Sequence, residues 1–278
     1  MFTLNCKGSL WIIDEPQVMG IINITPDSFY EKSRIANTHA AVELAAKMIN
    51  DGASIVDIGG QSTRPGADLI NPTEEIDRVL PVIEAIHQQF PSLLISIDSF
   101  HPEVAKAAVN AGASIVNDIS GGQFFEEMLP TVASLKVPYI CMHCNSDIKK
   151  MHEKIPYNNI SESIIQYFIE RMNACKKAGI IDVLIDPGFG FGKTVEDNFK
   201  LLKELECLSI FNAPLLLGVS RKSMIYKTLQ IEADQSLNGT TVLNTVGLLK
   251  GANMLRVHDV KEAVQAIQLT QLLGRKRN

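Results

Sequence analysis

The chain has 278 residues, of which 46% are hydrophobic and 21% are charged, and its formal net charge is −5. This length suits one large α/β domain or two ordinary ones, and a chain of this size buries about 75% of the surface that it exposes when unfolded. The acidic balance excludes a general nucleic-acid binder, because affinity for a phosphate backbone depends on an excess of basic residues. Any anion that the protein binds must therefore meet a local cluster of cations.

The cysteines and the apolar runs indicate in which compartment the protein resides. Five cysteines are scattered widely along the chain, an odd number that does not predict a disulfide framework. The N-terminal segment lacks the basic and apolar regions of a secretory signal, and no apolar run approaches the ~18 residues that a membrane span needs. We therefore expect a cytoplasmic protein with no membrane partner and no nucleic-acid partner.

A fragment recurs along the chain in the order helix, Gly-Ala, strand, polar residue. The segment Asp51–Asp57 is echoed by Ala111–Asn117, and looser echoes begin at Lys177 and Lys250. Each copy has a glycine where a helix needs a left-handed residue at its end, followed by a short β-branched or leucine run. Short apolar runs between amphipathic helical segments are typical of the strands of a buried parallel sheet.

The same rhythm predicts eight strands, each followed by a helical pattern. The expected strands are Val18–Ile24, Ser54–Ile58, Leu93–Asp98, Ser114–Ile119, Val137–Met142, Asp182–Asp186, Pro214–Val219 and Asn253–Val257. The expected helices are His39–Asn50, Pro72–Gln89, Pro102–Asn110, Phe124–Ser134, Ile160–Ala178, one that a capping box opens at Thr194, Lys222–Leu229, Thr240–Leu249 and one from Val260.

Eight β-then-α units over about 250 residues predict a (β/α)8 TIM barrel, for which this size is typical. The residues before Val18 alternate around Lys7 and Gly8 and predict an N-terminal β-hairpin that closes the bottom of the barrel. No linker interrupts the chain, so we expect a single domain over 1–278, with the hairpin at 1–17 and the barrel at 18–275. A doubly wound open sheet is the alternative architecture.

Polar residues recur where the predicted strands end. In a parallel barrel these carboxyl ends converge on one face, which carries the active site. A single aspartate at such a position is often only a helix cap, but a complete ring is hard to explain by capping alone. The ring comprises Asn23, Asp57, Asp98, Asn117, Asp118, His143, Asp186, Ser220–Ser223, Arg256 and His258.

The ring contains two kinds of chemistry. Asp57, Asp98, Asn117 and Asp186 offer hydrogen-bond acceptors, which suit a ligand with a flat, amidine-like or guanidine-like edge. A second set of cationic groups forms an anion trap that could hold a phosphate or diphosphate: Arg64, Lys222, Arg256 and His258. The predicted ligand is thus a nitrogen-rich heterocycle that carries an anionic leaving group.

Two loops support a ligand site at this face. Ser62–Gly66 follows the second strand with a Pro-Gly turn, and Asp186–Lys193 follows the sixth with alternating glycines that let the backbone approach a ligand. The second loop superficially resembles a phosphate-binding Walker loop. It fails that pattern because Pro187 occupies the position of the first required glycine.

Seven segments, in order and spread over almost the whole chain, resemble the dihydropteroate synthase family. They are MGIINITPDSF (Met19–Phe29), DIGGQSTRPGA (Asp57–Ala67), ISIDSFHP (Ile95–Pro102), VNDISGG (Val116–Gly122), DPGFGFGKT (Asp186–Thr194), GVSRK (Gly218–Lys222) and LRVHDV (Leu255–Val260). The resemblance implies a folate-pathway transferase and sulfonamide target, with Mg²⁺ as cofactor and a homodimeric assembly. It would condense 6-hydroxymethyl-7,8-dihydropterin diphosphate with 4-aminobenzoate by an SN1-like mechanism, giving 7,8-dihydropteroate and diphosphate.

The resemblance also implies a role for each matching residue. The pterin contacts would be Asp98, Asn117, Met142, Asp186 and Lys222; the diphosphate contacts Asn23, Thr63, Arg64, Arg256 and His258; the aminobenzoate contacts Thr63, Pro65, Phe191 and Ser223. Asn23 would also meet the magnesium, and Lys222, Asp98 and Arg64 would act in catalysis.

Three departures from the family pattern and several rival interpretations remain. The first loop reads Tyr30–Arg34 where the family usually has Ser-Asp-Gly-Gly, the stretch after His143 differs, and Gln61 replaces a common glutamate. The sequence assigns no role to His143.

The rival functions are a corrinoid-dependent pterin methyltransferase and a catalytically silent pterin-binding paralogue. Two alternatives for individual residues are less favoured. Lys222 could form a Schiff base, and the Cys141–Cys144 segment could be a zinc or redox site.

Overall fold

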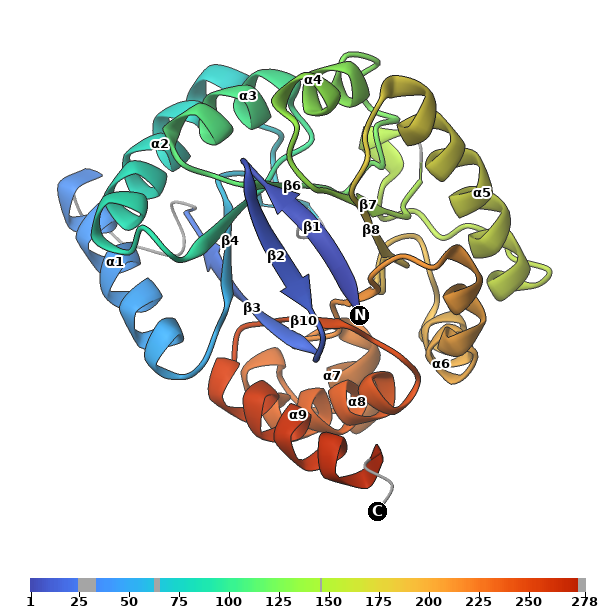
Figure 1. Cartoon of the computed structure of the whole chain (residues 1–278). Coiled ribbons are helices and arrows are strands. Elements are labelled where there is room, and N and C mark those ends of the chain that lie inside the picture. The colour runs from blue at the N-terminus through green and yellow to red at the C-terminus, as the bar shows by residue number, and fades with distance from the viewer. Residues whose placement is uncertain (25–33, 63–65, 146, 275–278) are drawn as a thin grey trace.

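A ring of parallel strands surrounded by helices dominates the computed structural model, which describes residues 1–24, 34–62, 66–145 and 147–274 (Figure 1). The strands of the ring are β3 (Gln17–Asn23), β4 (Ile55–Gly59), β5 (Leu94–Asp98), β6 (Ile115–Asp118), β7 (Tyr139–Met142), β8 (Val183–Asp186), β9 (Leu216–Leu217) and β10 (Met254–Val257). Each one lies within a residue or two of a strand predicted from the sequence.

The strand order closes the ring into a barrel. Neighbours follow the order β8-β7-β6-β5-β4-β3-β10-β9, and every pair in it is parallel. A parallel bridge between Ile185 and Leu215 then links β8 to the start of the β9 segment. The predicted (β/α)8 barrel is therefore confirmed, and the open-sheet alternative is wrong.

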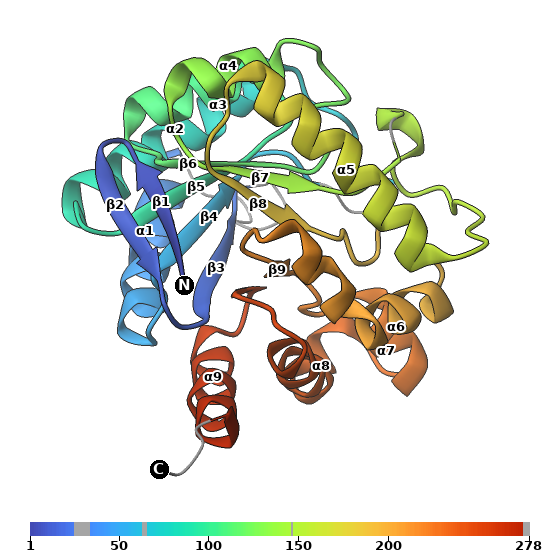
Figure 2. The same ribbon diagram turned by 45° about the vertical axis from the view of Figure 1, so that its right-hand side comes forward.

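Helices pack around the outside of the barrel, as Figures 1 and 2 show. They are α1 (Arg34–Asn50), α2 (Pro72–Gln89), α3 (Pro102–Ala111), α4 (Met128–Leu135), α5 (Ile160–Ala178), α6 (Val195–Lys203), α7 (Ser223–Leu229), α8 (Leu237–Leu249) and α9 (Val260–Gly274). Within the described residues, no helix is long and apolar enough to cross a membrane.

One helix begins later than the sequence predicts. α4 starts at Met128 rather than at Phe124, because the preceding residues form a turn organised by the buried carboxylate of Asp118. That carboxylate accepts hydrogen bonds from the backbone and hydroxyl of Ser120, the backbone of Gly122 and the hydroxyl of Tyr139. Asp118 therefore shapes a loop, and its acceptors are already occupied.

The internal repeat marks the ends of helices. Gly52 and Gly112 end α1 and α3 with φ of +100° and +133°, conformations that only glycine adopts without strain. The next backbone N–H reaches back across each helix end, from Ala53 to the carbonyl of Met48 and from Ala113 to that of Ala108. This is the hydrogen bond of a Schellman helix end, and it feeds each helix directly into the next barrel strand.

The N-terminal hairpin covers the amino-terminal end of the barrel. β1 (Phe2–Cys6) and β2 (Ser9–Ile13) pair antiparallel, and Lys7 and Gly8 between them both have positive φ, as a type I′ turn requires. Leu4, Cys6 and Ile13 share one apolar cluster with side chains from the amino-terminal halves of the barrel strands. Figures 1 and 2 show the hairpin lying across that end of the barrel. The predicted plug is confirmed, and it leaves the opposite end of the barrel for a site.

Candidate active site

The carboxyl ends of β4, β5, β6 and β10 bring three acidic or amide side chains around one guanidinium. Asp57 of β4 is completely buried, and its Oδ2 accepts a hydrogen bond of 3.0 Å from the amide of Asn117 on β6. The same oxygen accepts 2.6 Å from Nε of Arg256 on β10. Nη2 of Arg256 donates 2.6 Å to Asp98 at the end of β5. Residues far apart in the sequence thus form one hydrogen-bonded cluster.

The position of Arg256 differs from the sequence expectation of separate acceptor and cation sets. Its guanidinium lies between Asp57 and Asp98, so cation and acceptors are interleaved. Burial raises the pKa of the Asp98 carboxyl above its ordinary value, and the Arg256 guanidinium opposes that shift. The net result is a pKa of about 7, so the ion pair offsets only part of the effect of burial on the ionised, acceptor form of Asp98.

A second cluster joins β8 to the start of α7. Asp186, the last residue of β8, is buried and accepts a hydrogen bond of 2.7 Å from the backbone N–H of Gly188. Burial raises its pKa, while Lys222 opposes the shift. Burial in turn lowers the pKa of Lys222 to about 8, and Asp186 opposes that change. Each group thus favours the charged form of the other against the effect of burial.

The glycine-rich loop after β8 holds the Lys222 side chain. Its Nζ donates a hydrogen bond of 2.5 Å to the carbonyl of Phe189 and lies 5.1 Å from the ring centre of Phe191. A Cβ on Gly190, which has φ of +86°, would approach the Lys222 stem to 3.3 Å. The glycine at this position thus lets the loop pass close to the lysine, whereas the sequence predicted a close approach of the loop to a ligand.

The neighbours of Lys222 have different partners. Arg221 forms two hydrogen bonds to Asp259, of 3.0 and 2.6 Å, so its guanidinium faces α9 rather than the ring. The hydroxyl of Ser220 accepts from the backbone N–H of His258 at 3.2 Å and lies 3.0 Å from Nδ1 of that histidine. When the hydroxyl donates to Nδ1, the ring proton resides on Nε2, which makes His258 a donor suited to an anion.

Apolar side chains line the same mouth of the barrel. Met142, at the end of β7, and Phe191 belong to one cluster with Phe100 and Ile119. The ring of His152 stacks on Phe191 with centroids 5.4 Å apart. A flat apolar wall beside carboxylate acceptors suits an aromatic heterocycle, which needs both dispersion contacts and hydrogen bonds at its edge.

The other predicted site residues divide into two groups. Asn23 is half-buried at the end of β3, and Ser223 is the first residue of α7, so both lie at the carboxyl ends of the strands or just beyond them. Thr63, Arg64 and Pro65 lie outside the described residues. So do Thr25, Pro26 and Asp27 of the first loop and most of its divergent segment at 30–33.

Sequence reasoning placed Asp57 in the ring as an acceptor for a ligand rather than as a partner of Arg256, and it did not single out Lys193. Asp57 sits two residues before the end of its strand and is the hub between Asn117 and Arg256. Lys193 is buried against His143, a contact across two barrel strands that nothing in the sequence pattern indicates. For both residues, only the structure shows that the side chain is buried and which groups it contacts.

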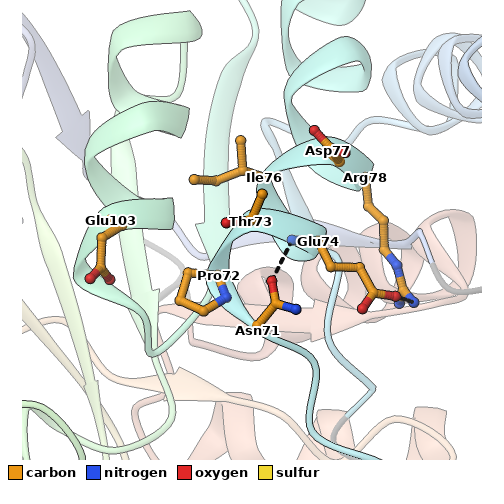
Figure 3. A pocket seen from close by; sticks show the side chains of 8 residues that line it. All are labelled: Asn71, Pro72, Thr73, Glu74, Ile76, Asp77, Arg78 and Glu103. Carbon is orange, nitrogen blue, oxygen red and sulfur yellow. Dashed lines mark hydrogen bonds and ion pairs between the residues drawn. The ribbon is translucent and has the colours of Figure 1, made fainter.

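A surface groove at the start of α2 and α3 lies on the same end of the barrel but outside the ring (Figure 3). Its lining carries Glu74, Asp77 and Glu103 against the single guanidinium of Arg78, which is ion-paired with Glu74 at 2.5 Å. A groove with this charge balance repels a diphosphate, so the ring remains the candidate site.

Comparison with known proteins decides the family. A family model described as pterin binding enzyme matches residues 19–258. The dihydropteroate synthase of Escherichia coli (strain K12) is 41% identical over 280 residues, which cover 99% of this chain and 98% of that protein. The solved structure of Xanthomonas albilineans dihydropteroate synthase with 4-aminobenzoic acid matches with a TM-score of 0.91 and 38% identity, covering 99% of this chain and 98% of that chain.

The chain belongs to the dihydropteroate synthase family. A further structure of the Xanthomonas albilineans member, in complex with 7,8-dihydropteroate, matches with a TM-score of 0.88 and 36% identity over 99% of this chain and 100% of that chain. Members of this family are transferases, and the match extends over hairpin and barrel alike.

One departure from the dihydropteroate synthase pattern has a clear structural consequence. The amide of Gln61, where the family commonly has glutamate, donates to the carbonyls of Ser62 and Asp68 at 2.7 and 3.0 Å. Its oxygen accepts 2.8 Å from the backbone N–H of Ile70. Because an ionised carboxylate cannot donate, only the amide can join both sides of the second loop in this way.

Proposed function

We propose that the chain condenses 6-hydroxymethyl-7,8-dihydropterin diphosphate with 4-aminobenzoate to give 7,8-dihydropteroate and diphosphate. The observation that carries the proposal is the convergence of Asp98, Asn117, Asp186 and Lys222 at one mouth of the barrel, beside the apolar wall of Met142 and Phe191. Family membership identifies the ring system that such a site would hold.

Pterin recognition follows from the donor and acceptor pattern. The edge of a pterin presents adjacent N–H donors, which Asp98 and Asp186 can accept, and ring nitrogen and carbonyl acceptors, which Asn117 and Lys222 can meet. Asn117 is held by Asp57 and Lys222 by Phe189, so both donors are oriented before the substrate arrives. Met142 would contact one face of the ring.

The proposed reaction proceeds by departure of diphosphate before attack. The bond between the pterin methylene carbon and the diphosphate oxygen breaks, and its electron pair leaves with the diphosphate. The nitrogen of 4-aminobenzoate then bonds to the carbon and releases a proton. The carboxylates of the half-buried Asp98 and the buried Asp186 would stabilise the positive charge that develops on the pterin, while Arg64, Arg256 and His258 would stabilise the leaving anion. We assign Lys222, Asp98 and Arg64 to catalysis.

The residues present fit a magnesium ion held mainly by the substrate. Within the described residues, no cluster of three or more His, Cys, Asp or Glu side chains could hold a metal by itself. Mg²⁺ is commonly bound by one or two protein oxygens, several waters and substrate phosphates. The side-chain carbonyl oxygen of Asn23, at the end of β3, would serve as such a protein ligand. When bound, the ion would neutralise charge on the departing diphosphate.

The aminobenzoate subsite is proposed from the family pattern and one described contact region. Phe191 and Ser223 both lie beside Lys222, since the Phe191 ring centre is 5.1 Å from its Nζ and Ser223 follows it in the chain. Thr63 and Pro65 of the second loop complete the proposed subsite, and Thr63 would also contact the diphosphate. The amine of the second substrate would then approach the reacting carbon from the loop side.

We also propose a homodimer in the cytoplasm. Apolar side chains on the outer faces of α8 and α9 are largely exposed, and burying such a patch against a second copy would stabilise an assembly. They are Val242, Leu249, Leu269, Leu272 and Leu273. The cytoplasmic location is supported by the five cysteines, all of which are free thiols.

Diphosphate release measures the proposed activity and separates its rivals. We expect release from the pterin diphosphate that requires both 4-aminobenzoate and Mg²⁺. Binding of the pterin diphosphate without any release would support the silent paralogue and contradict the proposal. Methyl transfer from a methylated folate to a corrinoid protein would contradict it in favour of the methyltransferase.

A further inference from the structure

Lys193 and His143 form a buried polar pair beneath the glycine-rich loop, outside the groups that would contact substrate. Both side chains are almost fully buried, with exposed fractions of 7% and 6%. Nζ of Lys193 lies 2.9 Å from Nδ1 of His143, which follows β7. Burying an ammonium is costly unless all its donors find partners, so a buried lysine requires a structural explanation.

The surroundings of Lys193 supply three acceptors for three donors. Besides His143, its amino group donates to the carbonyl of Gly188 at 2.8 Å and to that of Phe191 at 3.1 Å. Burial lowers the pKa of Lys193 to about 7, and the three acceptors favour its charged form against that shift. Burial, and next the positive charge of Lys193, lower the pKa of His143 well below its ordinary value, so the imidazole is neutral and can accept at Nδ1. The lysine therefore ties both ends of the loop segment 188–191 to the end of β7.

The tied segment is the one that positions Lys222. Phe189 lies between the two carbonyls that Lys193 binds, and its own carbonyl accepts the hydrogen bond from Lys222. Phe191 carries the second of those carbonyls, and its ring lies beside Nζ of Lys222. The crossing is tight, because a Cβ on Gly188 would lie 1.9 Å from the carbonyl oxygen of His143. A shift of the loop against β7 would therefore move the contacts of Lys222 directly.

We propose that Lys193 and His143 are positioning residues of the active site: together they fix the loop that orients Lys222 toward the pterin. This proposal rests on the proposed function for the role of Lys222, whereas the contacts themselves do not. A second tie, from the Gly190 N–H to Asn198 at 2.7 Å, holds the loop near its middle. Loss of the lysine contacts should therefore loosen the loop without unfolding it.

The test compares Lys193→Met, His143→Leu and His143→Asn with the wild type, and uses Lys203→Met on the exposed side of α6 as the matched control. Leucine removes the acceptor at Nδ1, whereas asparagine places a carbonyl oxygen near it. Because a misplacement of about 1 Å can cost about 100-fold in rate, we expect kcat/KM for the pterin diphosphate to fall at least about 30-fold in Lys193→Met and about 10-fold in His143→Leu. His143→Asn should recover most of this loss, and Lys203→Met should match the wild type.

Pterin affinity provides the second readout, measured by calorimetry with the pterin diphosphate alone at a temperature well below each thermal midpoint. Weaker binding in Lys193→Met and His143→Leu, with recovery in His143→Asn, supports the positioning role. Unchanged affinity and kcat/KM in Lys193→Met, or equal losses in both His143 variants, would overturn it. If Lys193→Met does not fold, the His143 pair decides. Failure of the wild type itself to release diphosphate would instead contradict the proposed function.

Discussion

Removing the carboxylate of Asp57 should destabilise the protein strongly, because it is the buried partner of two donors. Its Oδ2 accepts from Arg256 at 2.6 Å and from Asn117 at 3.0 Å, and the side chain has no exposed surface. Removing one member of a buried ion pair costs about 3–5 kcal/mol. Arg256 retains Asp98 and is partly exposed, so we expect the lower end of that range, about 3 kcal/mol, for Asp57→Ala.

An isosteric variant separates charge from shape at this position. Asp57→Asn can still accept both hydrogen bonds through one oxygen, so it should cost only about 1–2 kcal/mol, the difference between a charge-assisted and a neutral bond. Asp51→Asn is the control: its partner Lys47 is largely exposed, and solvent screens such surface pairs so strongly that their loss changes stability little.

The assay is denaturant unfolding of the single variants and of the double variant Asp57→Ala with Arg256→Met. Coupling between the two sites should be at least about 1 kcal/mol, because either change removes the same ion pair. A cost below about 1 kcal/mol for Asp57→Ala, or strictly additive costs in the double variant, would refute the assignment of Asp57 as the hub of the cluster.

Three further outcomes are expected. Gly188→Ala should fail to reach the native state, or lose most of its thermal stability, because the added Cβ would lie 1.9 Å from the His143 carbonyl oxygen; a wild-type thermal midpoint would contradict this. Burial raises the pKa of Glu75 to about 8, so the folded protein binds a proton there that the unfolded chain has lost. Stability should consequently fall as pH rises from about 4.5 to about 8, by at most about 1.4 kcal/mol per pH unit, and Glu75→Gln should flatten that slope; equal slopes in the two proteins would rule out Glu75 as its source. Lys222→Ala and Asp98→Ala should each lower kcat/KM at least about 100-fold while the fold survives, and wild-type rates in either would remove that residue from the site. Lys227→Ala, on the exposed part of α7, is the control for Lys222→Ala.

Much of the fold follows from the sequence because local signals agree with it. Glycines such as Gly52 and Gly112 end helices through a conformation that other residues avoid, and the β-branched runs after them enter a buried sheet. The capping box at Thr194 and Asp197 is present as predicted. The late start of α4 was not foreseeable, since it depends on the buried carboxylate of Asp118 and its partner Tyr139, which belongs to another strand.

The site was predicted as a set of strand ends but not as a network. The sequence shows that Asp98, Asn117 and Asp186 lie at one end of the barrel, because strand direction determines that end. It does not show that Arg256 lies between Asp57 and Asp98, nor that Lys193 meets His143. These contacts depend on strand register and side-chain direction across the barrel, which no local pattern specifies.

Product formation tests the central claim most directly. The protein should convert the pterin diphosphate and isotopically labelled 4-aminobenzoate, with Mg²⁺, into a compound with the mass of labelled 7,8-dihydropteroate, and release one diphosphate for each molecule formed. Mass spectrometry of the reaction together with a diphosphate assay measures both. Diphosphate release without the labelled condensation product, or no reaction although the pterin diphosphate binds, would contradict the account.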